Sequence, residues 1–378
     1  MFLFVLLWLF SASLFAQEVR RALPVHATPH EVAQFLAGFP VSGASALSSL
    51  QLTKEYLEHH LAIQKAWKEC QEQRFEPMKN WASQEMTSRI PAPTIVRYLF
   101  GGPDELSLLA LFPNASVYIL CGKEPVGKIM PPEELSTEQL KMGLSDLRES
   151  MKTFLHYGYF ITKEMKTTMG VGFFQGVTPI LFTFLALTGH QIIAVETVNL
   201  GGAPGIRIRF LAPAGGQEQM LYYMQTDLSN EASHSFLKWL GSFGPGAAYL
   251  KAASYLLHEE NFSRAREFLL NSSNTILEDD SGIPCRFFTP AVWSLYFFGD
   301  YKGPIELFRC QYQPDLYAAY AASPLRGPMP FGTGYQLIAG ASGGANLLLA
   351  VKKSFVPKAL PKGEEESSVK KIRGNKIK

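Results

Sequence analysis

The pattern of hydrophobic and polar positions is clearest over residues 94–127, where it predicts a strand–turn–helix–strand unit. Residues 94–100 are rich in β-branched and aromatic side chains, which is typical of a buried strand. Gly-Gly-Pro at 101–103 ends this run, and residues 105–112 then place apolar side chains on one face of a short helix. A second apolar strand is predicted over residues 116–121. We expect the two strands to lie at the centre of a sheet.

Helix signals dominate the chain before this unit. Thr28 is followed by Pro29 and Glu31, which is the pattern of a capping box with proline in the first turn. From about residue 52 to residue 74, apolar side chains recur at spacings of three and four, which predicts one long amphipathic helix. We therefore predict a helical N-terminal arm over residues 17–93, followed by an α/β body over residues 94–351.

Residues 170–195 carry no Asp, Glu, Lys or Arg, and their length would suffice to cross a bilayer. We favour a different interpretation, because Pro179 is placed to open a helix and Gly189 to end it. Residues 192–195 then have the apolar, β-branched character of a buried strand. A helix of about ten residues followed by a strand accounts for the apolarity without a membrane.

The C-terminal half mixes both patterns. Residues 205–211 alternate between apolar and charged positions and residues 219–226 return, which predicts a hairpin beside the main sheet. Residues 233–273 are predicted to be helical, with one of the helices over residues 246–259. The remaining predicted elements are strands over residues 293–298 and 345–351 and a helix over residues 315–322. The fold class predicted from these patterns is α/β, with a mixed sheet flanked by helices.

Charge is distributed unevenly along the 378 residues. The net charge is only +2, which argues against a nucleic-acid partner, because phosphate binding needs a concentrated basic surface. Residues 352–378 hold nine Lys and Arg against three Glu, so this tail carries +6 and the rest of the chain −4. The composition of the tail predicts that it is disordered.

The N-terminus has the pattern of an export signal. Residues 1–16 form an uncharged apolar run with small residues near its end, and we predict cleavage after Ala16. The run is shorter than the roughly 20 residues that a spanning helix needs. We therefore predict a periplasmic or extracellular protein that contacts a membrane through this segment only if the segment is uncleaved. A membrane-anchored scaffold is the corresponding alternative.

The four cysteines are Cys70, Cys121, Cys285 and Cys310. An oxidising compartment would permit disulfides, and Cys285 and Cys310 are the closest pair in sequence. Free, buried cysteines are the favoured interpretation, because the chain has ample apolar material for a core and does not need disulfide bonds to fold. The spacings do not favour zinc.

The Gly101–Asp104 motif is the first candidate site. Glycines between a strand and a helix are where α/β folds place ligand loops, so a methyltransferase-like or nucleotide-binding loop is one interpretation. The third glycine of the dinucleotide motif is missing, and Asp104 brings a negative charge to the place of a phosphate. An exported protein also rarely meets such cofactors. We therefore interpret Asp104 as a helix cap and predict no cofactor.

Acidic residues in loops form the second candidate site, and they are Asp104, Glu124, Asp279, Asp280 and Asp300. We predict that these loops bind a small polar ligand or a component of the cell envelope, without catalysis. The alternative is a secreted hydrolase, because two neighbouring carboxyl groups can act as acid and base. Asp and Gly at 279–282 could also offer oxygens to Ca²⁺, but ordinary turn chemistry is the favoured explanation and no metal site is predicted. No catalytic nucleophile is identified.

Several motifs occur together in a fixed order: GGPD, FPNA, G-x-EPVG, DDSGIP and PFGTGY. In this order they resemble a group of bacterial exported proteins, and the resemblance covers most of the chain after Pro93. It implies a bacterial, exported protein whose body belongs to one family. It implies no particular substrate or reaction.

Overall fold

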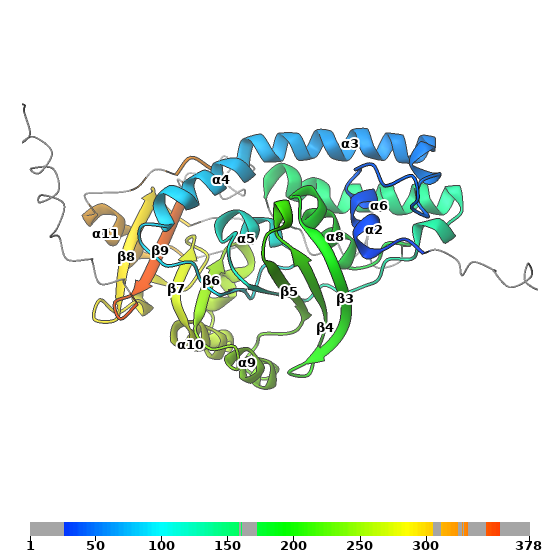
Figure 1. Cartoon of the computed structure of the whole chain (residues 1–378). Coiled ribbons are helices and arrows are strands. Elements are labelled where there is room, and N and C mark those ends of the chain that lie inside the picture. Colours follow the sequence, from blue (N-terminus) through cyan, green and yellow to red (C-terminus); the bar gives the residue numbers. More distant parts are fainter. Residues whose placement is uncertain are drawn as a thin grey trace, which may run out of the picture.

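A mixed sheet runs through the centre of the protein, with helices packed on both of its faces (Figure 1). The structure is a computed structural model that describes residues 26–158, 160, 172–304, 311–323, 327, 329–331 and 345–355. Within these residues the sheet has nine strands in the order β3-β4-β5-β2-β1-β6-β7-β9-β8. The predicted fold class, α/β with a mixed sheet flanked by helices, is confirmed.

The strands are parallel at the centre of the sheet and antiparallel at both edges. The five neighbours β5-β2-β1-β6-β7 are parallel. The β3-β4 hairpin extends one edge. At the other edge β9 lies antiparallel between β7 and β8, so β8 runs in the direction of the central strands. The strands are β1 (Ile95–Tyr98), β2 (Val117–Gly122), β3 (Gln191–Leu200), β4 (Ala203–Leu211), β5 (Glu218–Gln225), β6 (Gly246–Leu250), β7 (Ser273–Glu278), β8 (Trp293–Gly299) and β9 (Asn346–Lys352).

The predicted central strand pair is confirmed. β1 and β2 are adjacent and parallel, with Ile95 opposite Val117. Along β1, Val96 and Tyr98 pack into the core on one face of the sheet and Ile95 into the core on the other. This alternation is the period of two that a strand imposes on its side chains, and burial on both faces explains why the strand is apolar at almost every position.

Helices cover the two faces of the sheet. One face carries α2 (Pro29–Leu36), α3 (Lys54–Cys70), α4 (Glu76–Trp81), α5 (Glu105–Leu111), α6 (Thr137–Tyr157) and α8 (Thr178–Leu187). The other carries α9 (His234–Gly241), α10 (Ser263–Ser272) and α11 (Pro314–Ala322). Short 3-10 and π segments complete the described chain: η1 (Leu50–Leu52), η2 (Gln71–Phe75), η3 (Ala82–Met86), η4 (Pro132–Glu134), η5 (Pro213–Gly215), η6 (Ala252–His258), η7 (Glu260–Phe262) and η8 (Cys285–Phe287).

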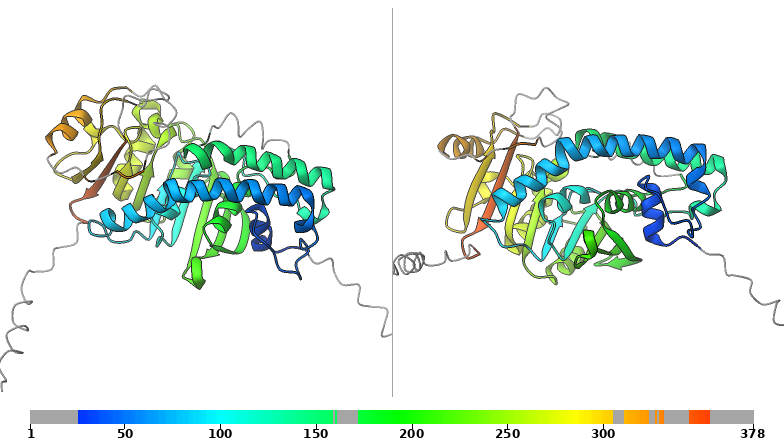
Figure 2. Two further views of the ribbon diagram at one scale, coloured as in Figure 1. Left: turned by 90° about the horizontal axis from the view of Figure 1, so that it is seen from above. Right: turned by 45° about the horizontal axis from the view of Figure 1, so that its top comes forward.

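The N-terminal helices share a hydrophobic core with the sheet. Helix α2 begins with the predicted capping box, in which Thr28 and Glu31 bond to each other's backbone. Helix α3 continues through η2, α4 and η3, and α3 lies beside α6 across the top of the sheet (Figure 2). Trp67 of α3 and Trp81 of α4 belong to the same buried cluster as Val96 of β1. The predicted arm therefore packs against the body over a continuous apolar surface.

The helix predicted over residues 246–259 is wrong. Residues 246–250 form β6, and η6 follows it. The reason is tertiary: β6 lies between β1 and β7, where strand pairing and burial on both faces outweigh the helical preference of its alanines. The strand β7 was also missed, because the helical region was predicted to extend to residue 273 and no strand was predicted over residues 273–278.

From residue 172 on, the uncharged stretch before Glu196 contains helix α8 and the start of β3, as predicted. The predicted burial of this strand is wrong: Ile192 is buried but Ile193 is exposed, because β3 lies at the edge of the sheet. No helix among the described residues is long and apolar enough to cross a membrane. Cys70, Cys121 and Cys285 are free and buried, as expected. The predicted signal segment (1–16), Cys310 and tail residues 356–378 lie outside the described residues.

Candidate functional site

The sheet brings all five predicted acidic residues to the edge formed by the carboxyl ends of its parallel strands. Asp104 follows β1, Glu124 follows β2, Asp279 and Asp280 follow β7, and Asp300 follows β8. These four strands run in the same direction, so their carboxyl ends meet at the same edge. In open α/β sheets this edge is where ligands bind.

Two of the five acidic residues line a common cavity of about 620 Å³. The cavity is formed mainly by residues 98–104 after β1, 122–124 after β2 and 251–256 after β6, with Phe160, Leu228 and Phe262 completing its walls. From β1 the chain proceeds to β2 and β5 on one side, and it later returns to β6 and β7 on the other. We refer to this cavity as the switch-point pocket, because it lies where the strand order reverses.

Asp104 is fixed on the floor of the pocket. Its Oδ1 accepts a hydrogen bond from the backbone N–H of Ser107 at 3.1 Å, so it caps α5 as predicted. Its Oδ2 accepts from the Ser107 hydroxyl at 2.9 Å and from Lys251 Nζ at 3.0 Å. Only 3% of the Asp104 side chain and 6% of the Lys251 side chain are exposed, so the pair is a buried ion pair. Lys251 also donates to the carbonyl of Gly158 at 2.8 Å.

Glu124 lies against the glycine loop that follows β1. The side chain is buried, and its Oε2 accepts from the Tyr223 hydroxyl at 3.3 Å. A Cβ atom on Gly122 would approach Glu124 Oε2 to 2.2 Å, so glycine is needed there for the carboxylate to occupy its position. Gly102, whose φ is +55°, donates its backbone N–H to the carbonyl of Cys121 at 2.9 Å and so holds the two loops together.

The walls of the pocket are largely apolar and include several aromatic side chains. Phe100 and Phe262 meet edge to face with their ring centroids 6.2 Å apart, and Tyr255 and Phe160 also line the cavity. Apolar walls with a few fixed polar groups are the usual composition of a small-molecule site. The pocket therefore offers flat apolar surfaces together with the carboxylates of Asp104 and Glu124.

Asp279 and Asp280 form a buried turn outside this cavity. Asp279 Oδ1 accepts from the backbone N–H of Ser281 at 2.9 Å and from its hydroxyl at 2.5 Å. Asp280 Oδ1 accepts from the side-chain amide of Asn346 at 3.0 Å. The cavity beside the turn measures about 10 Å³, which leaves no room for a ligand. Burial, followed by the neighbouring charge of Asp280, raises the pKa of Asp279 to about 7.

Asp300 lines neither of these two cavities. It is half-exposed, and its carboxylate is 3.7 Å from Lys302 Nζ on the surface. In the described part of the chain, no group of three or more His, Cys, Asp or Glu side chains is placed to hold a metal ion. The five predicted residues thus separate into a pocket pair, Asp104 and Glu124, a structural turn and a surface residue.

Lys251 is the pocket residue that sequence reasoning missed. It directly follows β6, which had been predicted as part of a helix, so its place at the edge of the sheet was not anticipated. The available signal was the short buried run at 246–250 after Gly244 and Pro245, ending in a charged residue. With β6 assigned as a parallel strand, Lys251 would have been expected at the same edge as Asp104.

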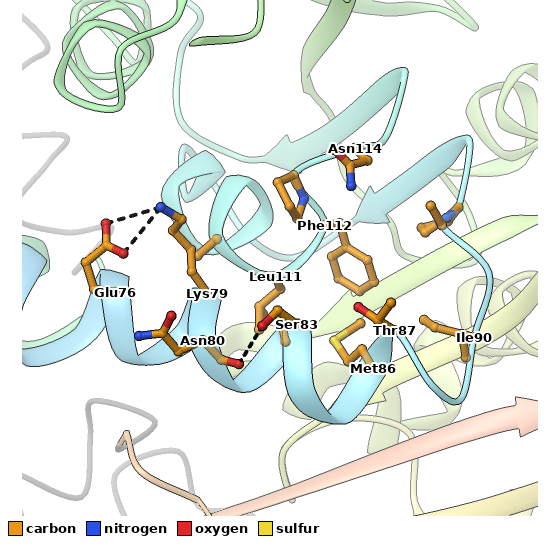
Figure 3. A pocket seen from close by; sticks show the side chains of 15 residues that line it. Glu76, Lys79, Asn80, Ser83, Met86, Thr87, Ile90, Leu111, Phe112 and Asn114 are labelled. Atoms are coloured by element: carbon orange, nitrogen blue, oxygen red, sulfur yellow. Dashed lines mark hydrogen bonds and ion pairs between the residues drawn. The ribbon is translucent and has the colours of Figure 1, made fainter. Parts of the chain in front are cut away.

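A second cavity, of about 340 Å³, lies between α4 and η3 on one side and the end of α5 on the other (Figure 3). It is lined by apolar side chains such as Met86, Ile90 and Phe112, and its lysine, Lys79, is paired with Glu76 at 3.2 Å. None of the five predicted acidic residues lines it. We therefore place the candidate site in the switch-point pocket.

Comparisons with family models, curated proteins and solved structures found no match to this chain. The function is accordingly inferred from the geometry of the pocket, its charges and its place in the sheet.

Proposed function

We propose that this protein is an exported bacterial protein that binds a small polar ligand in the switch-point pocket. The observation that carries the proposal is a cavity of about 620 Å³ at the reversal of strand order, with Asp104, Glu124 and Lys251 buried along it. This location is the general ligand site of open α/β sheets. The proposal narrows the predicted binding residues to Asp104 and Glu124 and assigns Asp279, Asp280 and Asp300 other roles.

The chemistry of the pocket supports a ligand with hydroxyl groups and a flat apolar side. Carboxylate oxygens accept hydrogen bonds from hydroxyl groups, and Glu124 lines the cavity. Aromatic walls stack on rings with little loss of side-chain entropy. Since Asp104 is already fixed by Ser107 and Lys251, the floor of the pocket needs no reorganisation when a ligand enters.

A thermal-shift panel of sugars, nucleosides and peptidoglycan fragments tests this proposal. A ligand that binds the native state raises the melting temperature in proportion to the logarithm of its concentration. We expect at least one of these classes to do so with the wild type, and Glu124→Gln to weaken the effect by about tenfold in affinity, or ~1.4 kcal/mol. Asp300→Asn is the matched control, because Asp300 lies outside the pocket. An equal loss of affinity in both variants would contradict the proposal, and so would the absence of a stabilising ligand in every class.

Export is the second part of the proposal, and it rests on the apolar run at residues 1–16. N-terminal sequencing of the mature protein from fractionated bacterial cells tests it. We expect the mature chain to begin at Gln17 and to be recovered from the periplasm or the medium without detergent. A chain that retains Met1, or that needs detergent for release, would support the membrane-anchored alternative instead.

A secreted hydrolase is the second candidate function, because two carboxyl groups, Asp104 and Glu124, line one cavity. The contacts of Asp104 weigh against it, since both of its oxygens already accept hydrogen bonds from Ser107 and Lys251. Hydrolysis of chromogenic glycosides that Glu124→Gln abolishes, with folding intact, would favour the hydrolase over simple binding.

A further inference from the structure

The strand order and the spacing of the two loops indicate the class of ligand. If the β3-β4 hairpin is left out and the other strands are numbered in chain order, the sheet reads 3-2-1-4-5-7-6. Its first five strands have the order of doubly wound nucleotide-binding sheets. In those sheets a glycine loop follows the first strand, and an acidic residue about 20 positions later binds the ribose hydroxyls. Here Glu124 follows Gly102 by 22 positions, and the two residues meet in the pocket.

The same pocket is unsuited to phosphate. In nucleotide-binding sheets the phosphates lie against free N–H groups at the start of the first helix. Here Asp104 occupies that place and accepts the N–H of Ser107. Both lysines of the lining face acids already: Lys251 pairs with Asp104, and Lys123 with Asp227 at 2.9 Å. A phosphate would therefore be repelled by the Asp104 carboxylate, and the lysines that could neutralise its charge are already paired with acids.

The walls fit the remaining part of a nucleoside. Phe100, Phe262 and Tyr255 line the cavity and present aromatic surface to it. A heteroaromatic base has a flat face that stacks on such rings, whereas its sugar carries neighbouring hydroxyl groups for a carboxylate. A nucleoside combines the two requirements in one small molecule, and the pocket lining contains both aromatic side chains and a carboxylate.

We propose that the switch-point pocket binds a phosphate-free nucleoside, with its ribose hydroxyls at Glu124 and its base against the aromatic wall of Phe100, Tyr255 and Phe262. This inference rests on the proposed function, because it requires the pocket to be a ligand site. It names the ligand class through three separate features: the acidic residue after β2, the aromatic wall and the occupied start of α5.

Isothermal titration calorimetry of the full mature chain tests the inference. The probes are adenosine, S-adenosylmethionine, 2′,3′-dideoxyadenosine, AMP and ATP. Adenosine and S-adenosylmethionine distinguish a free nucleoside from a sulfonium derivative of the same class, and at least one of them should bind. AMP and ATP should bind at least tenfold more weakly than adenosine or S-adenosylmethionine, and dideoxyadenosine at least tenfold more weakly than adenosine if adenosine is the ligand.

Two variants locate the contacts. Glu124→Gln should weaken binding of the ribose-bearing probe about tenfold, and Tyr255→Ala should weaken binding of every probe that carries a base. Tyr255 is only partly buried, so its truncation leaves the core intact, and circular dichroism checks the fold of both variants. Asp300→Asn again serves as the control outside the pocket.

The outcomes separate this inference from the proposed function. If ATP binds as tightly as the preferred phosphate-free probe, or if removing the ribose hydroxyls has no effect, the inference is wrong. If sugars or peptidoglycan fragments bind in a manner sensitive to Glu124→Gln while no nucleoside binds, the inference is wrong and the proposed function stands. If no probe of any class binds the folded protein, both are wrong.

Discussion

At the scale of single residues, the buried ion pair between Lys251 and Asp104 decides the character of the pocket floor. Two charges with so little exposure are tolerated because each also has hydrogen-bond partners, Ser107 for Asp104 and the Gly158 carbonyl for Lys251. Breaking such a pair leaves one charge buried and unpaired, which costs far more than removing the whole pair.

We therefore predict that Lys251→Met lowers the free energy of unfolding by about 3–5 kcal/mol. The double variant Lys251→Met/Asp104→Asn should recover part of this loss, because no buried charge then remains. Urea denaturation of the two single variants and the double variant measures the coupling. Strictly additive losses would show that the two side chains do not stabilise each other.

Asp279 makes stability depend on pH. Burial raises its pKa in the folded protein to about 7, whereas the pKa in the unfolded chain is about 3.9. The folded state therefore favours the protonated acid. The stability that Asp279 contributes is complete below about pH 4 and is lost as the pH rises towards 7. The loss is at most about 1.4 kcal/mol for each pH unit.

We predict that the wild type loses stability relative to Asp279→Asn between pH 4 and pH 7. Unfolding free energies measured at several pH values in this window check the prediction, and Asp300→Asn should retain the slope of the wild type, since Asp300 is half-exposed. An Asp279→Asn variant with an unchanged slope would contradict the assignment.

At the scale of elements, Arg97 of β1 holds the helices on one face of the sheet. The side chain is fully buried, and it donates hydrogen bonds to the carbonyls of Leu240, Gly244 and Ser272. These carbonyls lie at or just after the C-terminal ends of α9 and α10, where helices leave acceptors without partners. Burial lowers the pKa of Arg97 to about 10, so it stays charged at neutral pH.

We predict that Arg97→Lys lowers the free energy of unfolding by about 2–3 kcal/mol, because an ammonium group cannot reach several carbonyls as the planar guanidinium does. Arg97→Met should cost no more than Arg97→Lys, since methionine leaves no charge in the core. Chemical denaturation of the two variants compares them. A lysine variant more stable than the methionine variant would show that charge, not geometry, is what the site requires.

At the scale of the whole molecule, the helices before β1 and the sheet share one apolar core. Phe35 of α2, Trp67 of α3 and Leu144 of α6 belong to the same buried cluster as Tyr118 of β2. A core that is continuous across two segments couples their unfolding. The domain boundary at residue 93 stays a prediction, and thermal unfolding can measure whether the two segments unfold together.

We predict a single cooperative thermal transition for the whole chain. Far-UV circular dichroism reports mainly the helices, and near-UV circular dichroism reports tryptophans in both segments, so the two midpoints should coincide. Trp67→Ala should lower both midpoints together, because it opens a cavity in the shared core. Two separate transitions, with only one shifted by Trp67→Ala, would indicate independent domains.

The sequence predicted what depends on neighbours along the chain. The α5 cap at Asp104, the strands β1 and β2 and the helix–strand division before Glu196 were recognised, because capping, turn chemistry and side-chain period act over a few residues. Strand β6 was missed, since its alanines favour a helix and only its neighbours β1 and β7 make it a strand. That error concealed Lys251.

What the sequence by itself determined is therefore the set of loops that carry acidic residues, and the local structure around Asp104. The tertiary structure decided which of these residues act together. Lys251 and Asp104 are 147 positions apart, and they meet only because β6 pairs with β1 on the side opposite β2. The same strand order places Glu124 in the pocket and Asp279 outside it, because distance across a sheet depends on strand order and not on separation along the chain.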